Sequence, residues 1–183
     1  MSQGILILHP ENRHSHPDVR QVARLLQHNG LMGCAIDGIP GSYFAGEQFL
    51  QLITFMGCSP HIRFEPEDEL DRGFCYITLT TCDTPQIRIS EHARPPRCCT
   101  CNKPVGKRWQ TAVTQGQLIT CPHCHQQQTP EQLGWRNDAG MGRFFIEIHN
   151  IFPGEAQPVP ALLQQLSGID TSPWRYFYLH AFK

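Results

Sequence analysis

The chain has 183 residues, of which 15 are basic and 16 acidic, so its formal net charge is −1. This length supports one well-buried core with a small insertion, and the balanced charge decides neither for nor against nucleic acid as a partner. No apolar stretch approaches the roughly 18 residues that a membrane span needs. The N-terminal apolar run, Ile5 to Leu8, has no basic lead and no cleavage site, so we expect no signal peptide and a cytoplasmic protein.

The N-terminal third predicts strands alternating with a helix. Apolar residues at 4–8 indicate a short buried strand, and the spacing of apolar residues over 15–27 predicts a helix. Ser15 and Asp18 resemble a capping box at the start of that helix. Residues 31–36 predict a second strand.

The middle of the chain predicts a second helix and then a hairpin. Apolar residues spaced at helical intervals over 44–56 indicate the helix. Alternating apolar and polar residues over 74–81 and 86–90 predict two strands paired as a hairpin. Between them, the acidic stretch 65–71 is expected to form a solvated loop, or to dock against a basic surface.

The C-terminal part predicts a strand over 143–152, a helix over 159–166 and a strand over 174–180. Together these patterns predict the α+β class, with a mixed sheet, two or three helices and one inserted module. We expect one discontinuous α+β body and one insertion; an arrangement of two independent halves bridged by the insertion is the alternative. The predicted boundaries are 1–93 and 131–183 for the body and 94–130 for the insertion.

The insertion carries two Cys-x-x-Cys pairs, and 19 residues separate them. Two cysteines three positions apart on a tight turn present both sulfurs to one ion, about 2.3 Å away. The four ligands predicted are Cys98, Cys101, Cys121 and Cys124. Zinc is the metal ion that such a four-thiolate site usually binds. Iron in a rubredoxin-type site uses the same four thiolates and stays an alternative.

The pairs and the residues between them, from about 97 to 128, resemble the zinc-ribbon class. The resemblance implies that each pair lies on a turn at the tip of a β-hairpin, with strands over 109–113 and 117–120 and a reversal at Gly116. It covers under a fifth of the chain, and no family is recognised for the rest.

Other ligands and other chemistry are possible at this site. Cys99 adjoins Cys98, but the two-residue gap to Cys101 favours Cys98, which leaves Cys99 as a spare thiol. His123 or His125 could replace a sulfur. A redox dithiol is a further alternative, although neither pair has the helix N-terminus that usually activates one.

Basic residues gather around the predicted metal site. From 92 to 130 there are five lysines and arginines and no acidic residue. These cations can compensate the thiolates while the neighbouring tryptophan covers the metal; alternatively, they contact phosphates while its ring stacks on a base. The candidate contact residues are Arg97, Lys103, Lys107, Arg108 and Trp109.

Two functions of different classes follow. The first is a non-enzymatic adaptor or regulatory protein that uses the metal module for macromolecular contact, with a protein partner favoured slightly over nucleic acid. The second is an enzyme with a structural zinc and a pocket near His9, His14, His16 and the loop from Gly38 to Ser42. The histidines can bind a second metal, and the glycine-rich loop can cradle an anion or be a plain connector. Cys58, close to His61, is a further candidate nucleophile.

Overall fold

The structure is a computed structural model that describes residues 2–57, 62–68 and 70–182. Its main feature is a six-stranded antiparallel sheet in the order β10-β1-β8-β5-β3-β2, together with two separate two-stranded pairs, β4-β9 and β6-β7. The elements are β1 (Ser2–Pro10), α1 (Val19–His28), β2 (Met32–Ala35), β3 (Ser42–Ala45), α2 (Phe49–Leu52), β4 (Ile53–Phe55), β5 (Tyr76–Ile89), α3 (Trp109–Thr114), β6 (Ile119–Thr120), β7 (Gln127–Gln128), η1 (Pro130–Gln132), β8 (Ala139–His149), β9 (Ala156–Pro158), α4 (Pro160–Asp170) and β10 (Trp174–Phe182).

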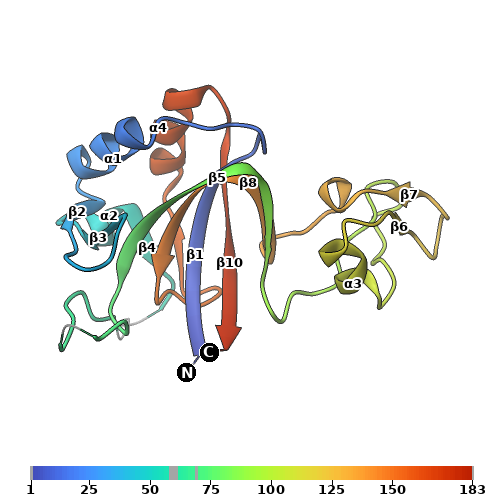
Figure 1. Cartoon of the computed structure of the whole chain (residues 1–183), viewed down its shortest axis with the longest axis horizontal. Helices are drawn as coiled ribbons and strands as arrows, with labels where there is room; N and C mark the ends of the chain where they lie inside the picture. Colours follow the sequence, from blue (N-terminus) through green and yellow to red (C-terminus); the bar gives the residue numbers. More distant parts are fainter. Residues whose placement is uncertain (1, 58–61, 69, 183) are drawn as a thin grey trace.

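The α+β class is confirmed, although every strand pairing in the described residues is antiparallel and the sheet is not mixed. The strands at the two ends of the chain, β1 and β10, pair along their whole length from Ser2–Phe182 to Pro10–Trp174. This pairing brings the termini together at one end of the sheet (Figure 1). The first and last strands of the chain are therefore neighbours in the sheet, with β10 at its edge.

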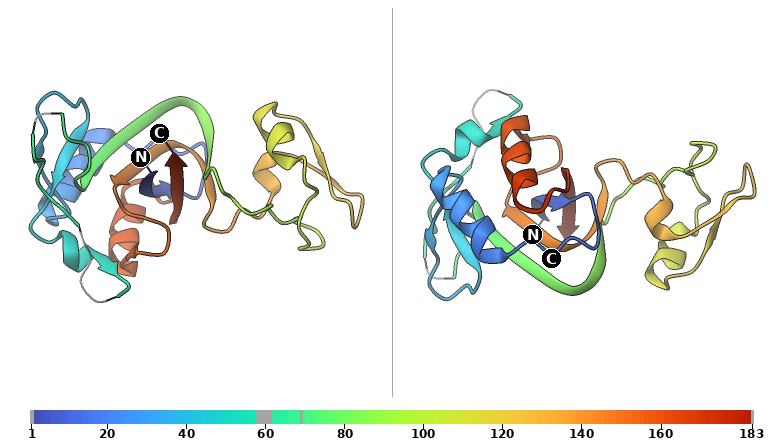
Figure 2. Two further views of the ribbon diagram at one scale, coloured as in Figure 1. Left: turned by 90° about the horizontal axis from the view of Figure 1, so that it is seen from below. Right: turned by 90° about the horizontal axis from the view of Figure 1, so that it is seen from above.

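The main core lies between one face of the sheet and the two longer helices. Helices α1 and α4 contact each other on that face (Figures 1 and 2). Leu26 of α1 and Leu166 of α4 are fully buried together with Leu6 and Ile146 of the sheet. Burial of such side chains contributes roughly 1.5–3 kcal/mol each. This cluster holds α1 and α4 against the sheet.

Helix α1 begins three residues later than the capping box predicted. Asp18 is its N-cap and accepts the backbone N–H of Arg20 at 2.7 Å. Ser15 donates its hydroxyl hydrogen to Asp170 at the end of α4 instead of capping α1. The contact with Asp170, which is distant in the sequence, thus decides the role of Ser15. A local sequence pattern cannot predict such a contact.

The helix predicted over 44–56 is wrong. The segment contains strand β3, the single helical turn α2 and strand β4. Ser42 to Phe44 pair with β5, and β4 pairs with β9. Gly46 lies so close to the carbonyl of Gly30 that an added Cβ would be 2.3 Å from that oxygen. Long-range strand pairing overrides the helical spacing of the apolar residues.

The hairpin predicted over 74–90 is also wrong, because these residues form one 14-residue strand, β5. Both ends of β5 pair with β8, from Ile77–Ile148 to Ile89–Ala139. The register shifts between Thr81 and Gln86, and this irregularity contains Pro85, which lies between the two predicted strands. Proline has no backbone N–H, and an irregularity of this kind accommodates it within a strand.

The long β5–β8 pair determines where the cysteines lie. Its last pair is Ile89–Ala139, so residues 90–138 form the connection between the two strands. We call this segment the β5–β8 connection. Figures 1 and 2 show it to one side of the sheet, joined by two extended segments. It has its own hydrophobic cluster, to which Ile87 and Ile89 of β5 also contribute.

The face of the sheet opposite the helices buries charged groups. Glu147 and Phe145 alternate along β8 with the core residues of the helix-covered face. Arg88 of β5 forms an ion pair with Glu147, and its guanidinium lies 4.4 Å from the ring centre of Phe145. The Nε2 atom of His149 is 3.8 Å from Glu147 and 3.1 Å from the hydroxyl of Thr78. Buried charges need such partners, because desolvation is otherwise costly.

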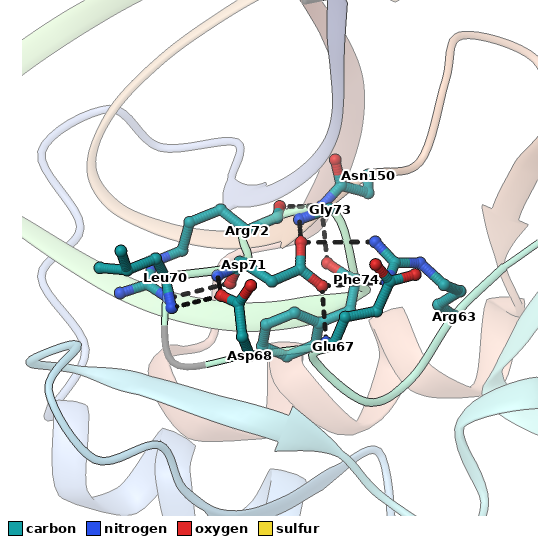
Figure 3. A network of polar contacts seen from close by, with 9 residues as sticks. All are labelled: Arg63, Glu67, Asp68, Leu70, Asp71, Arg72, Gly73, Phe74 and Asn150. Atoms are coloured by element: carbon teal, nitrogen blue, oxygen red, sulfur yellow. Dashed lines mark hydrogen bonds and ion pairs between the residues drawn. The ribbon is translucent and has the colours of Figure 1, made fainter.

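The acidic segment is a loop hydrogen-bonded to itself (Figure 3). Asp71 accepts the backbone N–H groups of Glu67 and Gly73 and pairs with Arg63 at 3.0 Å. The Glu67 N–H is the largest cause that lowers the pKa of Asp71. Asn150, just after β8, donates to the carbonyls on both sides of Gly73.

The loop lies at the end of the molecule away from the β5–β8 connection, so it does not dock against the basic residues there (Figures 1 and 2). Glu69 of this stretch lies outside the described residues.

Candidate metal centre

The four cysteines lie in two turns of the β5–β8 connection. The first turn follows Arg97, whose backbone bridges to Pro104 and to Gly134. The second turn joins β6 to β7. The strands on both sides of the second turn are paired, Ile119 with Gln128 and Thr120 with Gln127, so Cys121 and Cys124 lie at the tip of a hairpin.

The two turns repeat one backbone pattern with an offset of 23 residues. In the first, the N–H of Cys98 donates to Lys103 and the N–H of Asn102 donates to Cys98. In the second, Cys121 donates to Gln126 and His125 donates to Cys121. Asn102 and His125 both have positive φ, 57° and 61°. Asparagine and histidine are among the residues that tolerate this left-handed conformation. Each turn therefore presents its two sulfurs in the same way.

The four sulfur atoms form one compact cluster. All of them lie within 4.8 Å of one another. Cys98 Sγ is 3.6 Å from Cys124 Sγ, and Cys101 Sγ is 3.6 Å from Cys121 Sγ. Sulfurs bound to a tetrahedral zinc ion at about 2.3 Å are separated by about 3.8 Å, whereas a disulfide requires about 2.05 Å. The cluster is thus able to bind a metal ion such as zinc.

Backbone N–H groups around the sulfurs favour the thiolate form. Thr100 donates to Cys98 Sγ and His123 donates to Cys121 Sγ, both at 3.4 Å. The N–H of Cys101 is the largest cause that lowers the pKa of Cys98 to about 6, whereas burial and the neighbouring thiols raise the pKa of Cys124 to about 12. Metal ligation needs the thiolate, and hydrogen bonds to the charged form stabilise it.

Gln128 is a further residue of the site, and sequence reasoning missed it. Its side chain is 1% exposed, donates from Nε2 to Cys98 Sγ at 3.0 Å, and accepts the N–H of Cys99 at 2.8 Å. It therefore supports the first turn from the hairpin that carries the second. Residues 126–128 are three consecutive glutamines, and no sequence signal distinguishes the buried one.

Replacing Gln128 by alanine should lower the affinity for the metal about 10- to 100-fold, the usual effect of losing a supporting hydrogen bond at a metal site. The change removes one donor to Cys98 and leaves the N–H of Cys99 without its acceptor. Competition against a chromophoric chelator measures the affinity. Gln127→Ala, at the exposed neighbouring position, is the control and should retain wild-type affinity. Equal affinities for the two variants would contradict the role of Gln128.

A hydrophobic cluster lies beside the cysteines and contains Trp109. The strand predicted over 109–113 is wrong: these residues belong to helix α3, which buries Trp109 and Val113 one turn apart. Trp109 is 4% exposed, and its ring meets that of Trp135 edge to face at 5.3 Å. In this conformation Trp109 packs the connection and its ring is not available to stack on a base. The reversal predicted at Gly116 falls in the turn after α3, where φ is +63°.

The basic residues of the connection differ in what they contact. Arg97 donates to the carbonyl of Asn102 at 3.0 Å. Lys103, Lys107 and Arg108 are exposed, and no carboxylate among the described residues forms an ion pair with them. These three side chains therefore leave positive charge on the surface of the connection.

The alternative ligands lie outside the cluster. Cys99 is exposed, and its sulfur lies 3.7 Å from the hydroxyl of Thr100. Within the part of the chain that the structure describes, the four-cysteine cluster is the one group of histidine, cysteine or acidic side chains arranged to hold a metal. His123 and His125 do not belong to it.

The other candidate sites are not assembled as the sequence suggested. His14 and His16 are exposed, and His14 accepts a hydrogen bond from its neighbour Arg13. His9, unlike those two exposed histidines, is buried in the sheet. Residues 38–41 lie between β2 and β3, and Ser42 is the first residue of β3, so this segment has no helix N-terminus with which to bind an anion. Cys58 and His61 lie outside the described residues.

Fold and site together define an α+β protein with a four-cysteine cluster able to bind a metal. No protein-family model matches the chain, and neither a curated protein nor a solved structure matched it in the comparisons. Among the described residues, no helix is long and apolar enough to cross a membrane.

Proposed function

We propose that Cys98, Cys101, Cys121 and Cys124 bind one zinc ion, and that the metal shapes a zinc-ribbon-type module, residues 94–130, inserted into the α+β body. The convergence of four sulfurs within 4.8 Å carries this proposal. A cage of four protein ligands leaves no coordination position for a substrate, which is typical of structural zinc. The same four thiolates can hold iron, and elemental analysis distinguishes the two metals.

The role that follows is macromolecular contact by a non-enzymatic adaptor or regulatory protein. Lys103, Lys107 and Arg108 supply exposed positive charge on the module. The burial of Trp109 removes the one aromatic ring beside these cations that was expected to stack on a base. A protein partner with an acidic surface therefore suits the module better than a single-stranded nucleic acid. A reducing, cytoplasmic setting fits the free thiols of Cys34, Cys75 and Cys82.

Charge reversal tests this role. Lys107→Glu combined with Arg108→Glu should abolish capture of specific protein partners by the zinc-loaded chain, because like charges across an interface are costly. The matched control is Arg20→Glu with Arg24→Glu, two exposed cations on α1, and it should capture the same partners as wild type. Equal capture by all three proteins would refute the contact role of the module.

Labelled RNA and DNA, titrated at low salt, test the runner-up partner. We expect no binding, because the chain has almost no net charge to attract a polyanion. Binding that weakens steeply with salt and is lost in the Lys107/Arg108 variant would instead make nucleic acid the partner.

A further inference from the structure

A cleft of about 600 Å³ lies where the β5–β8 connection returns to the sheet. It is lined by residues of β1 and β10, including His9 and Arg175, by residues 131–137 and by the start of β8. Small-molecule sites typically have volumes of roughly 300–1,000 Å³ and often lie between two packed units. The size therefore suits an organic molecule rather than a single ion. None of the four cysteines lines the cleft, so the inference does not depend on the zinc proposal.

Positive charge exceeds negative charge in the cleft lining. Arg175 pairs with Glu11, and Arg13 lies 3.8 Å from Glu131. The side chains of Arg175 and Arg13 are 66% and 43% exposed, and ion pairs so exposed contribute little and exchange easily. Arg136, the third arginine, has no ion pair with a carboxylate of the described residues. Planar guanidinium groups match a carboxylate or a phosphate with two parallel hydrogen bonds.

A buried imidazole lies beside these arginines. His9 is 7% exposed, and its ring packs edge to face on Phe177 at 5.3 Å. Burial is the main cause that lowers the pKa of His9 to about 4, so the ring is neutral at neutral pH. The carbonyls of Pro10 and Met141 are near enough to affect that pKa, yet Nδ1 has no hydrogen-bond partner among the described residues. Buried polar atoms without a hydrogen-bond partner are rare in folded proteins, so this one asks for an explanation.

Two aromatic rings supply flat walls. Trp135 is held by its indole N–H, which donates to the carbonyl of Pro130 at 2.8 Å. The hydroxyl of Tyr176 donates to Gln157 at 3.3 Å. Both rings line the cleft and are partly exposed, so a planar group can pack on them.

We propose that this cleft binds a small organic anion with a planar ring. Arg136 and Arg175 hold the acid group, and the ring lies against Trp135, close to His9. Such a ligand bridges the sheet and the β5–β8 connection, because the cleft is lined from both.

Three probes test the proposal on the full, metal-loaded chain: adenosine monophosphate, benzoate and inorganic phosphate. Calorimetry gives the affinities, and the ring resonances of His9 in two-dimensional NMR report on the location. We expect at least one of the two ring-bearing anions to bind at millimolar concentration or below, to shift the His9 resonances, and to bind at least tenfold more tightly than phosphate.

The variants Arg136→Ala and Arg175→Ala should each weaken that binding at least threefold and the double variant more than tenfold. Both positions are exposed, so their loss should leave the fold intact. Arg20→Ala, an exposed cation on α1, is the matched control and should bind as wild type does. Three results would each overturn the proposal: no binding by either ring-bearing anion, phosphate binding as tightly as they do, or affinities that the arginine variants leave unchanged.

Discussion

The Cys121→Ser variant is expected to lose its zinc and to unfold the β5–β8 connection while the six-stranded sheet stays folded. Structural zinc contributes roughly 10–16 kcal/mol in small finger peptides, and that binding energy is folding energy. Cys121 is fully buried in the hydrophobic cluster of the β5–β8 connection, so the serine would replace both a ligand and a packed side chain. The sheet and its two helices have a separate cluster that contains none of the four cysteines.

Elemental analysis measures the zinc, and amide hydrogen exchange locates the unfolded residues. Cys99→Ser is the matched control, because Cys99 adjoins a ligand but lies outside the sulfur cluster. It should keep one equivalent of zinc and wild-type exchange. Protein purified without added metal should contain one zinc per chain; less than half an equivalent, or a red iron-loaded protein, would refute the zinc assignment. Global unfolding of Cys121→Ser would show that the connection is integral to the main core.

The second large effect is expected at Glu147, on the sheet face opposite the helices. Glu147→Ala should destabilise the protein by about 3 kcal/mol, the lower end of the roughly 3–5 kcal/mol that breaking a buried pair costs. The guanidinium of Arg88 would lose its carboxylate, and its side chain is 25% exposed, so water compensates only part of the loss. Chemical denaturation of the variant and of wild type measures the difference.

Two further variants separate the ion pair from a general effect of losing a glutamate. Glu47→Ala changes an exposed residue after β3 and should alter stability by less than about 0.5 kcal/mol. Arg88→Met combined with Glu147→Leu removes both charges and should recover most of the lost stability, because hydrophobic replacement of a buried pair is often neutral. If the double variant were less stable than Glu147→Ala, the unpaired cation would not be the cause.

Strong local patterns predicted several elements of the fold. Strands β1 and β10 and helices α1 and α4 lie within a few residues of their predicted positions. The two strands contain runs of apolar or aromatic residues and the two helices have apolar residues at helical spacing, and such local patterns depend little on the rest of the chain. The failed predictions, over 44–56, 74–90 and 109–113, fall where the structure depends on distant partners. There the pairing partners β5, β8 and β9, and the packing of Trp109, decide the outcome.

The sequence by itself determined the α+β class and the four cysteines that converge. Two cysteines three positions apart on a turn meet the same ion whatever surrounds them, so spacing alone identifies a site of this kind. The tertiary structure alone decided four features: the role of Gln128, the burial of Trp109, the Arg88–Glu147 ion pair on the sheet face opposite the helices, and the cleft at His9. Each depends on residues far apart in the chain, such as Gln128 with Cys98 and His9 with Phe177, and no local pattern records which distant side chains meet.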